Sequence, residues 1–266
     1  MLLRVASWRG GVRCLSAGPA AAAPSVQAEL LQKSLEQTQK YGFTRDAIDT
    51  ACRLLDLSPA SHALVYDHSR SSICGNDAEV ALVHEFMRRC NCELEERMQQ
   101  LPVESMRVTD IVRTGLRMRL GMIAPVLPHW PRAMALGALP SHAPETARLV
   151  AEITDIVWRA VDRKFAAKNT EGGTVQEHQT GKDGFDISFY TKRGMAGAVY
   201  AATELFMLSD ASTELQDTWH FLDRRLDDVL ALGKAPEQVR QVADFAFSAA
   251  QAQFASILSK TTSTPQ

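Results

Sequence analysis

Three things that this 266-residue chain lacks limit what it can be. It has no run of eighteen apolar residues, the length that a membrane-spanning helix needs, and its longest candidate, residues 194–208, contains Glu204. Its 29 basic residues are balanced by 31 acidic ones, and a net charge of −2 does not attract a phosphate backbone. Its five cysteines are an odd number without framework spacing, so we interpret them as reduced thiols. A membrane-spanning helix, general nucleic-acid binding and a disulfide scaffold are therefore not expected.

The usual motifs of catalysis are missing as well. The sequence contains no glycine-rich phosphate loop, no G-x-S-x-G, no H-E-x-x-H and no Glu-x-x-His pair of the kind that holds two irons. Cys90 and Cys92 follow His84 by six and eight residues, but side chains two apart on a helix point to different sides. We interpret both as structural cysteines and predict no catalytic residue, no metal site and no cofactor.

The N-terminal segment lacks negative charge. Residues 1–28 contain no Asp or Glu. Apolar residues alternate there with three arginines about one helical turn apart, Arg4, Arg9 and Arg13. This pattern is typical of a mitochondrial presequence, which we place at residues 1–16, followed by a linker over 17–24 rich in Ala and Pro. The alternative is a frayed terminus with three arginines by chance.

The remaining chain lacks the alternation of β-strands, and its apolar residues recur at spacings of three and four, so we predict an all-α fold. The expected helices cover residues 25–40, 45–55, 59–66, 77–100, 107–124, 144–167, 186–208, 213–231 and 236–260. The fifth of them must end at Pro125, Pro128 and Pro131. Residues 168–184, rich in Gly, Thr and Gln, are expected to form an exposed loop.

Two of these helices carry distinct apolar faces. Residues 213–231 show a stripe at four- and three-residue spacing, formed by Leu215, Trp219, Leu222, Leu226 and Val229. It covers barely two heptads, which favours core packing over a coiled coil. Residues 236–260 form an amphipathic helix too short to span a bilayer, which either lies on a membrane surface or folds back as the last helix of the bundle.

The first three helices resemble the helix-turn-helix of TetR-type regulators, with the turn at residues 42–44. The third helix, which would enter the major groove, contains no Lys or Arg, and residues 26–74 hold five basic against six acidic residues. We therefore expect the TetR-like fold without DNA binding. The alternative is a ligand-sensing transcriptional regulator that has kept this fold.

The helix after Arg193 is rich in small residues. Its first half, residues 194–203, contains Gly and Ala on several faces, which allows a neighbouring helix or a lipid chain to approach closely. Arg193 would place a fixed positive charge beside such a groove, as a lipid headgroup requires. The alternative is a buried core helix preceded by a solvated arginine.

Several segments together resemble the mitochondrial lipid-binding accessory proteins of ubiquinone (coenzyme Q) biosynthesis, a TetR-like family. The segments that carry the resemblance are the helix-turn-helix, residues 129–133 (HWPRA), 155–158 (DIVW), 186–193 and 203–219. They occur in the family's order over about residues 26–232.

The resemblance implies a non-catalytic role in mitochondria, on the matrix side of the inner membrane. A peripheral homodimer would bind isoprenoid quinone intermediates or phospholipid and present them to the demethoxyubiquinone hydroxylase. It also implies a role for Arg193 at the lipid site. The implied contacts with the hydroxylase are Asp155, Val157, Trp158, Phe189 and Tyr190. The expected domains are then a helix-turn-helix-like subdomain (25–75), a helical lipid-binding domain (76–232), an amphipathic membrane helix (233–260) and a tail (261–266).

Overall fold

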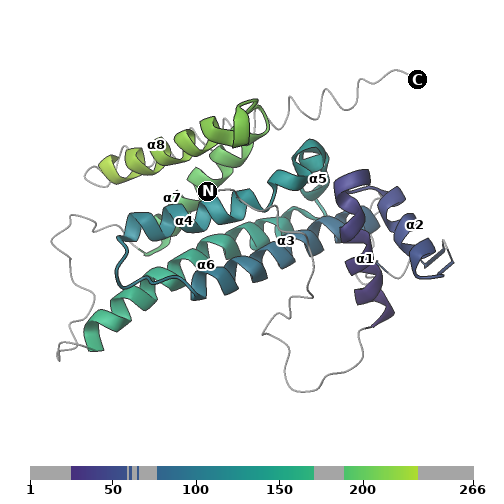
Figure 1. Cartoon of the computed structure of the whole chain (residues 1–266), viewed down its shortest axis with the longest axis horizontal. Coiled ribbons are helices and arrows are strands. Elements are labelled where there is room, and N and C mark those ends of the chain that lie inside the picture. Colours follow the sequence, from purple (N-terminus) through teal and green to yellow (C-terminus); the bar gives the residue numbers. More distant parts are fainter. Residues whose placement is uncertain (1–24, 59, 62–64, 66–76, 171–188, 233–266) are drawn as a thin grey trace. The chain divides into compact units, whose positions relative to one another are not determined.

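A computed structural model of the protein describes residues 25–58, 60–61, 65, 77–170 and 189–232, without the side chains of 167–170, 189–192 and 230–232. Within these ranges every regular element is a helix (Figure 1), so the all-α prediction is confirmed, and the arrangement is consistent with a TetR-like bundle. The elements are α1 (Val26–Tyr41), α2 (Arg45–Leu54), α3 (Asp77–Gln99), α4 (Val108–Gly121), η3 (Ala124–His129), α5 (Trp130–Gly137), α6 (Ala143–Thr170), α7 (Phe189–Met207), η4 (Thr213–Leu215) and α8 (Gln216–Leu232).

The chain divides into two compact units. The first lies within Met1–Glu93 and Arg132–Thr146, and the second within Leu94–Pro131 and Ala147–Gln266. The division therefore falls inside α3. The predicted presequence, the third helix of the helix-turn-helix and the amphipathic helix at 236–260 lie largely or wholly outside the described residues.

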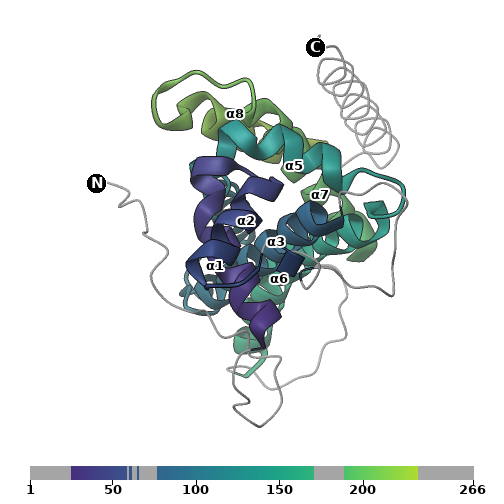
Figure 2. The ribbon, with the colours of Figure 1, turned by 90° about the vertical axis from the view of Figure 1, so that its right-hand side faces the viewer.

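The first unit is built on the pair α1 and α2, which pack against each other (Figures 1 and 2). The Ser25 hydroxyl accepts a hydrogen bond from the Ala28 N–H at 3.2 Å and caps the start of α1. Gly42 ends α1 with φ 69°, a conformation that side chains disfavour, and so turns the chain into α2. Phe43 is fully buried at this turn and meets Phe86 of α3 edge to face at 5.3 Å.

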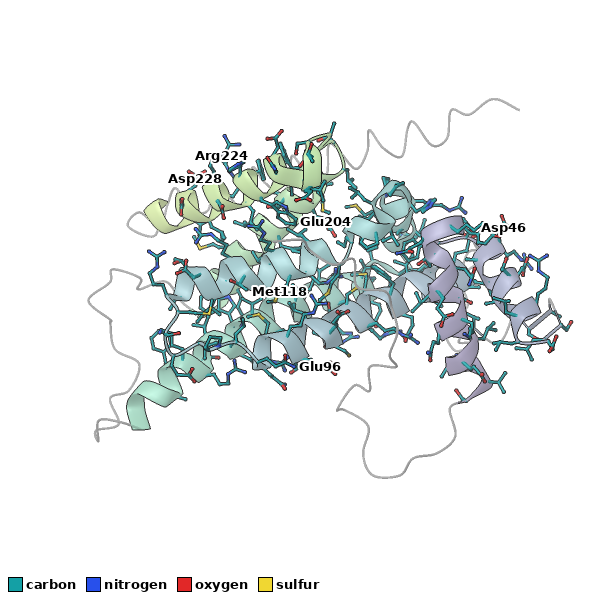
Figure 3. All side chains as sticks on the ribbon, viewed as in Figure 1. Asp46, Glu96, Met118, Glu204, Arg224 and Asp228 are labelled. Carbon is teal, nitrogen blue, oxygen red and sulfur yellow. The ribbon has the colours of Figure 1, made fainter. Side chains whose placement is uncertain are left out.

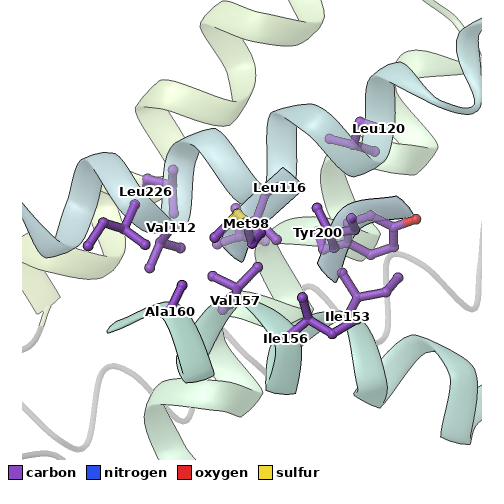
Figure 4. Close-up of a cluster of buried hydrophobic side chains, with 14 of the residues drawn as sticks. Met98, Val112, Leu116, Leu120, Ile153, Ile156, Val157, Ala160, Tyr200 and Leu226 are labelled. Carbon is purple, nitrogen blue, oxygen red and sulfur yellow. The ribbon is translucent and has the colours of Figure 1, made fainter. Parts of the chain in front are cut away.

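The second unit has a single apolar core (Figure 4). It is lined by the end of α3, by α4, by one face of α6, by α7 and by α8. The predicted stripe on α8 packs on this core: Leu222 and Leu226 are buried, and Trp219 and Val229 are partly buried against it. The interpretation of the stripe as core packing is thus confirmed. Arg224 and Asp228, by contrast, point away from the bundle on the outer face of α8 (Figure 3).

Two basic side chains of α6 donate hydrogen bonds to backbone carbonyls in the last turn of α3 and in the connection that follows it. The Arg163 guanidinium donates to the carbonyl oxygen of Met98 at 2.7 Å, and the Lys164 ammonium donates to the carbonyls of Val103 and Glu104 at 3.3 and 2.9 Å. The last carbonyls of a helix have no partners within it and carry partial negative charge. These contacts therefore fix the α3–α4 connection onto α6.

The three prolines after α4 were expected to end that helix, but they lie within the two helices that follow it. Helix α4 ends at Gly121, and Pro125 and Pro128 then lie within the short 3₁₀ helix η3. Pro131 is the second residue of α5, a helix that we did not predict. A proline is tolerated in the first turn of a helix because its missing N–H would have no partner there. The predicted loop at 168–184 also begins later, since residues 168–170 still belong to α6.

The closest approach in the second unit occurs at Gly115 of α4. A Cβ atom there would lie 2.7 Å from Cγ2 of Val157 and 3.2 Å from Sδ of Met98. The β-branched Val157 has little rotamer freedom in a helix, so it cannot move aside cheaply. This glycine allows α4 and α6 to pack in contact.

We predict that Gly115→Ala lowers the free energy of unfolding by about 1–3 kcal/mol through overpacking. Gly121→Ala, at the end of the same helix, is the matched control, because a Cβ there meets no atom of the described residues within 4 Å. The control should leave stability unchanged or raise it by up to about 1 kcal/mol. Urea unfolding of the three proteins measures both effects, and equal stabilities for the two variants would contradict the close packing.

Candidate functional site

The predicted lipid and partner residues come from two neighbouring helices of the second unit. Asp155, Val157 and Trp158 lie on α6, whereas Arg193 lies in the second turn of α7. Phe189 and Tyr190 form the start of α7, but their side chains lie outside the described residues.

Asp155 and Arg193 form an ion pair, which joins the predicted partner surface to the predicted lipid site. The Nε atom of Arg193 lies 3.0 Å from Oδ1 of Asp155, in an ion-pair contact rather than an aligned hydrogen bond. The Arg193 side chain is only 15% exposed, while that of Asp155 is 56% exposed. The guanidinium is thus held at the seam between α6 and α7 by a carboxylate that still faces solvent.

Val157 and Trp158 have different environments although they are neighbours. The side chain of Val157 is fully buried in the core (Figure 4), so it offers no surface for direct contact with a partner. We therefore correct its expected role to that of a core residue. Trp158 is partly buried, and its indole Nε1 is shielded from solvent without a hydrogen-bond acceptor in the described part of the chain.

Helix α7 is a core helix on one face and carries a surface of small residues on the other, so it has both of the properties between which its sequence did not decide. One face is core, with Met195, Ala196, Val199 and Tyr200 buried. Its other side carries small residues that are exposed or partly exposed: Gly194, Gly197, Ala198, Ala201 and Ala202. A Cβ at Gly194 would meet no described atom within 4 Å, so the described part of the chain leaves the space beside Arg193 open.

A second polar feature, which sequence reasoning missed, lies further along α7. The Glu204 carboxylate accepts hydrogen bonds from the Tyr200 hydroxyl at 3.0 Å and from the Trp130 indole N–H at 3.1 Å. Tyr200 and Trp130 are 1% and 3% exposed, and the nearby Arg119 is completely buried. Figure 3 shows Glu204 among the helices rather than on an outer face. Trp130 belongs to the HWPRA segment, whose spatial partner 74 residues away no local pattern could show.

The charge of Glu204 is controlled by opposing effects. Burial raises the pKa of its carboxyl above the ordinary value, against the influence of the Arg119 charge and of the two hydrogen bonds, which lower it. A raised carboxyl pKa means that the folded state binds the proton more tightly than the unfolded chain does. This contribution to stability is complete below about pH 4.5 and is lost as the pH rises through the folded-state pKa.

The connection between α7 and α8 is held by Asp210. Its carboxylate accepts hydrogen bonds from the Ser212 N–H at 2.7 Å and from the N–H and hydroxyl of Thr218 at 2.8 and 2.5 Å. Burial acts to raise the pKa of Asp210, but these hydrogen bonds outweigh it and bring the pKa down to about 2. The Trp219 indole also donates to the Glu214 carbonyl at 3.0 Å. Thr218 and Trp219 of the resembling segment therefore anchor the start of α8.

The cysteines and histidines form no metal site within the described ranges, where no group of three His, Cys, Asp or Glu side chains could hold a metal ion. Cys52 and Cys90 are buried thiols, whereas Cys92 is disulfide-bonded, which corrects the expectation that all five are reduced. His84 instead lies 2.9 Å from the Thr146 hydroxyl in the first unit. Among the described helices, none is long and apolar enough to cross a membrane.

The comparisons with known proteins support the resemblance. The sequence model of the COQ9 family matches residues 177–233, the region of α7 and α8. The chain is 29% identical over 226 residues to the rat protein named "Ubiquinone biosynthesis protein COQ9, mitochondrial" and 30% identical over 226 residues to the human one. It is 27% identical over 219 residues to the probable COQ9 protein of Dictyostelium discoideum.

The chain is related to the COQ9 proteins. The rat and human alignments cover 82% of this chain but only 63% and 62% of those relatives, so the chain spans less than two thirds of their length. The family match contains Arg193 and Glu204, whereas Asp155 and Trp158 lie on α6 outside it.

We predict that Tyr200→Phe lowers the free energy of unfolding by about 1–2 kcal/mol at neutral pH, because it removes one of the two hydrogen bonds to a buried carboxylate. Tyr41→Phe is the control, since the Tyr41 side chain is only partly buried. Loss of its hydroxyl group should lower the free energy of unfolding by less than about 0.5 kcal/mol. Chemical unfolding followed by circular dichroism compares the two. Equal losses would mean that the Glu204 hydrogen bonds contribute nothing particular to the second unit.

Proposed function

We propose that this protein acts in ubiquinone biosynthesis in mitochondria, as a non-catalytic lipid-binding protein. It binds isoprenoid quinone intermediates or phospholipid at the matrix face of the inner membrane and presents them to the demethoxyubiquinone hydroxylase. The observation that carries this proposal is the similarity to COQ9 proteins, whose names place them in ubiquinone biosynthesis and in mitochondria. The proposed protein is a peripheral homodimer.

The geometry supports presentation of a lipid rather than mere storage. Arg193, the proposed lipid residue, and Asp155, a proposed hydroxylase contact, are joined by one ion pair at 3.0 Å. A headgroup held by the guanidinium would therefore lie within one side-chain length of the partner. The open space beside Gly194 leaves room at the same point for an apolar chain along α7.

The lipid half of the proposal is tested with Arg193→Gln. Removal of the charge should reduce the amount of lipid that co-purifies with the protein severalfold, because a headgroup phosphate or carbonyl loses its cationic partner. The Asp155 carboxylate that loses its partner is 56% exposed and stays hydrated, so the fold should persist.

Arg159→Gln is the matched control for this test. Arg159 lies on α6, is 56% exposed and pairs with Glu95 at 3.2 Å, so it shares the chemistry of Arg193 but not its position. Mass spectrometry of lipid extracts measures both variants. If Arg193→Gln retains the same lipids in the same amount as wild type, the lipid site is placed wrongly.

The partner half is tested with Trp158→Ala and Tyr190→Ala. Aromatic side chains at the centre of an interface commonly contribute more than about 2 kcal/mol to binding, so each variant should weaken binding to the purified demethoxyubiquinone hydroxylase by tenfold or more. Val157→Ala serves as the contrast, because Val157 is buried: it should lower stability but leave the affinity of the folded protein unchanged. Unchanged affinity in both aromatic variants would remove the hydroxylase from the proposal.

A further inference from the structure

The exposed face of α6 continues beyond the residues discussed so far. Phe165 lies seven positions after Trp158, and Asp162 lies seven positions after Asp155, so all four share one side of the helix. Phe165 is 38% exposed, and the other large hydrophobic side chains exposed to this degree in the described ranges, Val26 and Leu54, belong to the first unit. We call these four residues the α6 stripe.

The α6 stripe has an excess of negative charge. Asp162 is exposed and has no cationic partner within the described part of the chain. The next two residues, Arg163 and Lys164, are directed to carbonyls in the last turn of α3 and in the α3–α4 connection, and so do not neutralise it. Arg159 on the same exposed side is paired with Glu95. Between the two aromatic side chains, the stripe therefore offers a carboxylate that is not neutralised.

The start of α7 extends this surface. Helix α7 runs in the direction opposite to α6: a Cβ at Gly197 would lie 3.5 Å from Cγ2 of Thr154, whereas Arg193, one turn earlier on α7, meets Asp155, the next residue of α6. The backbone of the first turn of α7, which contains Phe189 and Tyr190, therefore lies beside the part of α6 that follows Asp155. The α6 stripe therefore lies beside the backbone of the segment that contains the two remaining proposed hydroxylase contacts.

We propose that the α6 stripe binds a helix of the hydroxylase that presents an apolar side chain to Trp158 and Phe165 and a Lys or Arg to Asp162. This inference rests on the proposed function and extends its contact surface by two turns. The exposed Phe165 and the partly buried Trp158, with a carboxylate between them, match an amphipathic helix that has an apolar face and a basic edge. The carboxylate contributes to orientation and to the association rate, and the aromatic pair to the affinity.

Other occupants fit the stripe less well. An anionic phospholipid surface repels Asp155 and Asp162, since basic residues are what such surfaces attract. In a symmetric contact with a second copy of the chain, the same patch meets itself, so the Asp162 carboxylates of the two copies would approach each other without a cation between them.

The test measures binding of the purified demethoxyubiquinone hydroxylase to full-length wild type, Phe165→Ala and Asp162→Lys. Each variant should weaken binding about tenfold. The loss in Asp162→Lys should shrink between roughly 50 mM and about 300 mM salt, whereas the loss in Phe165→Ala should not, because ions screen exposed charges but not apolar contacts. Both side chains are exposed, and Asp162 carries no internal contact whose loss would unfold the protein.

Matched controls come from the first unit. Leu54→Ala removes an apolar side chain that is 60% exposed, and Asp46→Lys reverses an exposed acidic charge on α2. Neither should change the affinity. If Trp158→Ala weakens binding but Phe165→Ala and Asp162→Lys do not, the stripe is refuted while the proposed function stands.

If Trp158→Ala and Tyr190→Ala also bind the hydroxylase as wild type does, the hydroxylase part of the proposed function fails together with the stripe. Analytical ultracentrifugation and vesicle flotation of the same variants complete the test. A change in self-association, or in binding to cardiolipin-containing vesicles, at unchanged affinity for the hydroxylase would assign the stripe to a second copy or to the membrane and overturn the proposal.

Discussion

The contact between α4 and α6 is the constraint on which the rest of the second unit depends. Gly115 allows Val157 to lie against the backbone of α4, and this contact determines which side of α6 faces inward. Side chains project at fixed angles around a helix axis, so the residues that face the core determine which residues face solvent. Once Ile153, Val157 and Ala160 are buried, Asp155 and Trp158 must lie toward solvent or at its edge. The core packing thus places the surface that we assign to lipid and partner.

The charges near the end of α6 follow the same division of sides. Arg163 donates to the Met98 carbonyl in the last turn of α3 and Lys164 to the Glu104 carbonyl in the α3–α4 connection, which is a structural use of positive charge. Because these cations are occupied there, Asp162 keeps its negative charge on the other side of the helix. Acidic and basic residues are nearly equal in number in the sequence, but on the exposed side of α6 negative charge is in excess. Counts of charged residues therefore could not reveal this local excess.

Much of the fold was predictable because it depends on local periodicity. The helix bounds and the stripe on α8 follow from spacings of three and four residues and from caps such as Ser25 and Gly42. Helix α5 was not predictable in this way. Three prolines within seven residues indicate an ending, and only the surrounding packing determines that Pro131 occupies the first turn of a new helix.

Sequence reasoning could predict only those features of the site that depend on residues close together in the sequence. The placement of Asp155 and Arg193 came from resemblance, and their ion pair joins residues 38 positions apart. Resemblance alone does not show which side chains are exposed. It implied that Val157 contacts a partner, but the Val157 side chain is buried in this chain. The side that a residue occupies depends on the register between helices, which local patterns do not report.

The polar group around Glu204 supplies part of that register. Trp130 reaches the Glu204 carboxylate from a distant part of the chain, and this hydrogen bond forms only when Trp130 and α7 adopt a single relative setting. The Tyr200 hydroxyl donates to the same carboxylate from one turn earlier on α7. Apolar contacts tolerate sliding by a fraction of a turn, whereas a buried carboxylate that loses a donor pays the full cost of its desolvation. The same α7 carries Arg193 three turns earlier. A slip that broke the Glu204 contacts would therefore also separate Arg193 from Asp155, which makes the interior polar group a structural requirement for the surface ion pair.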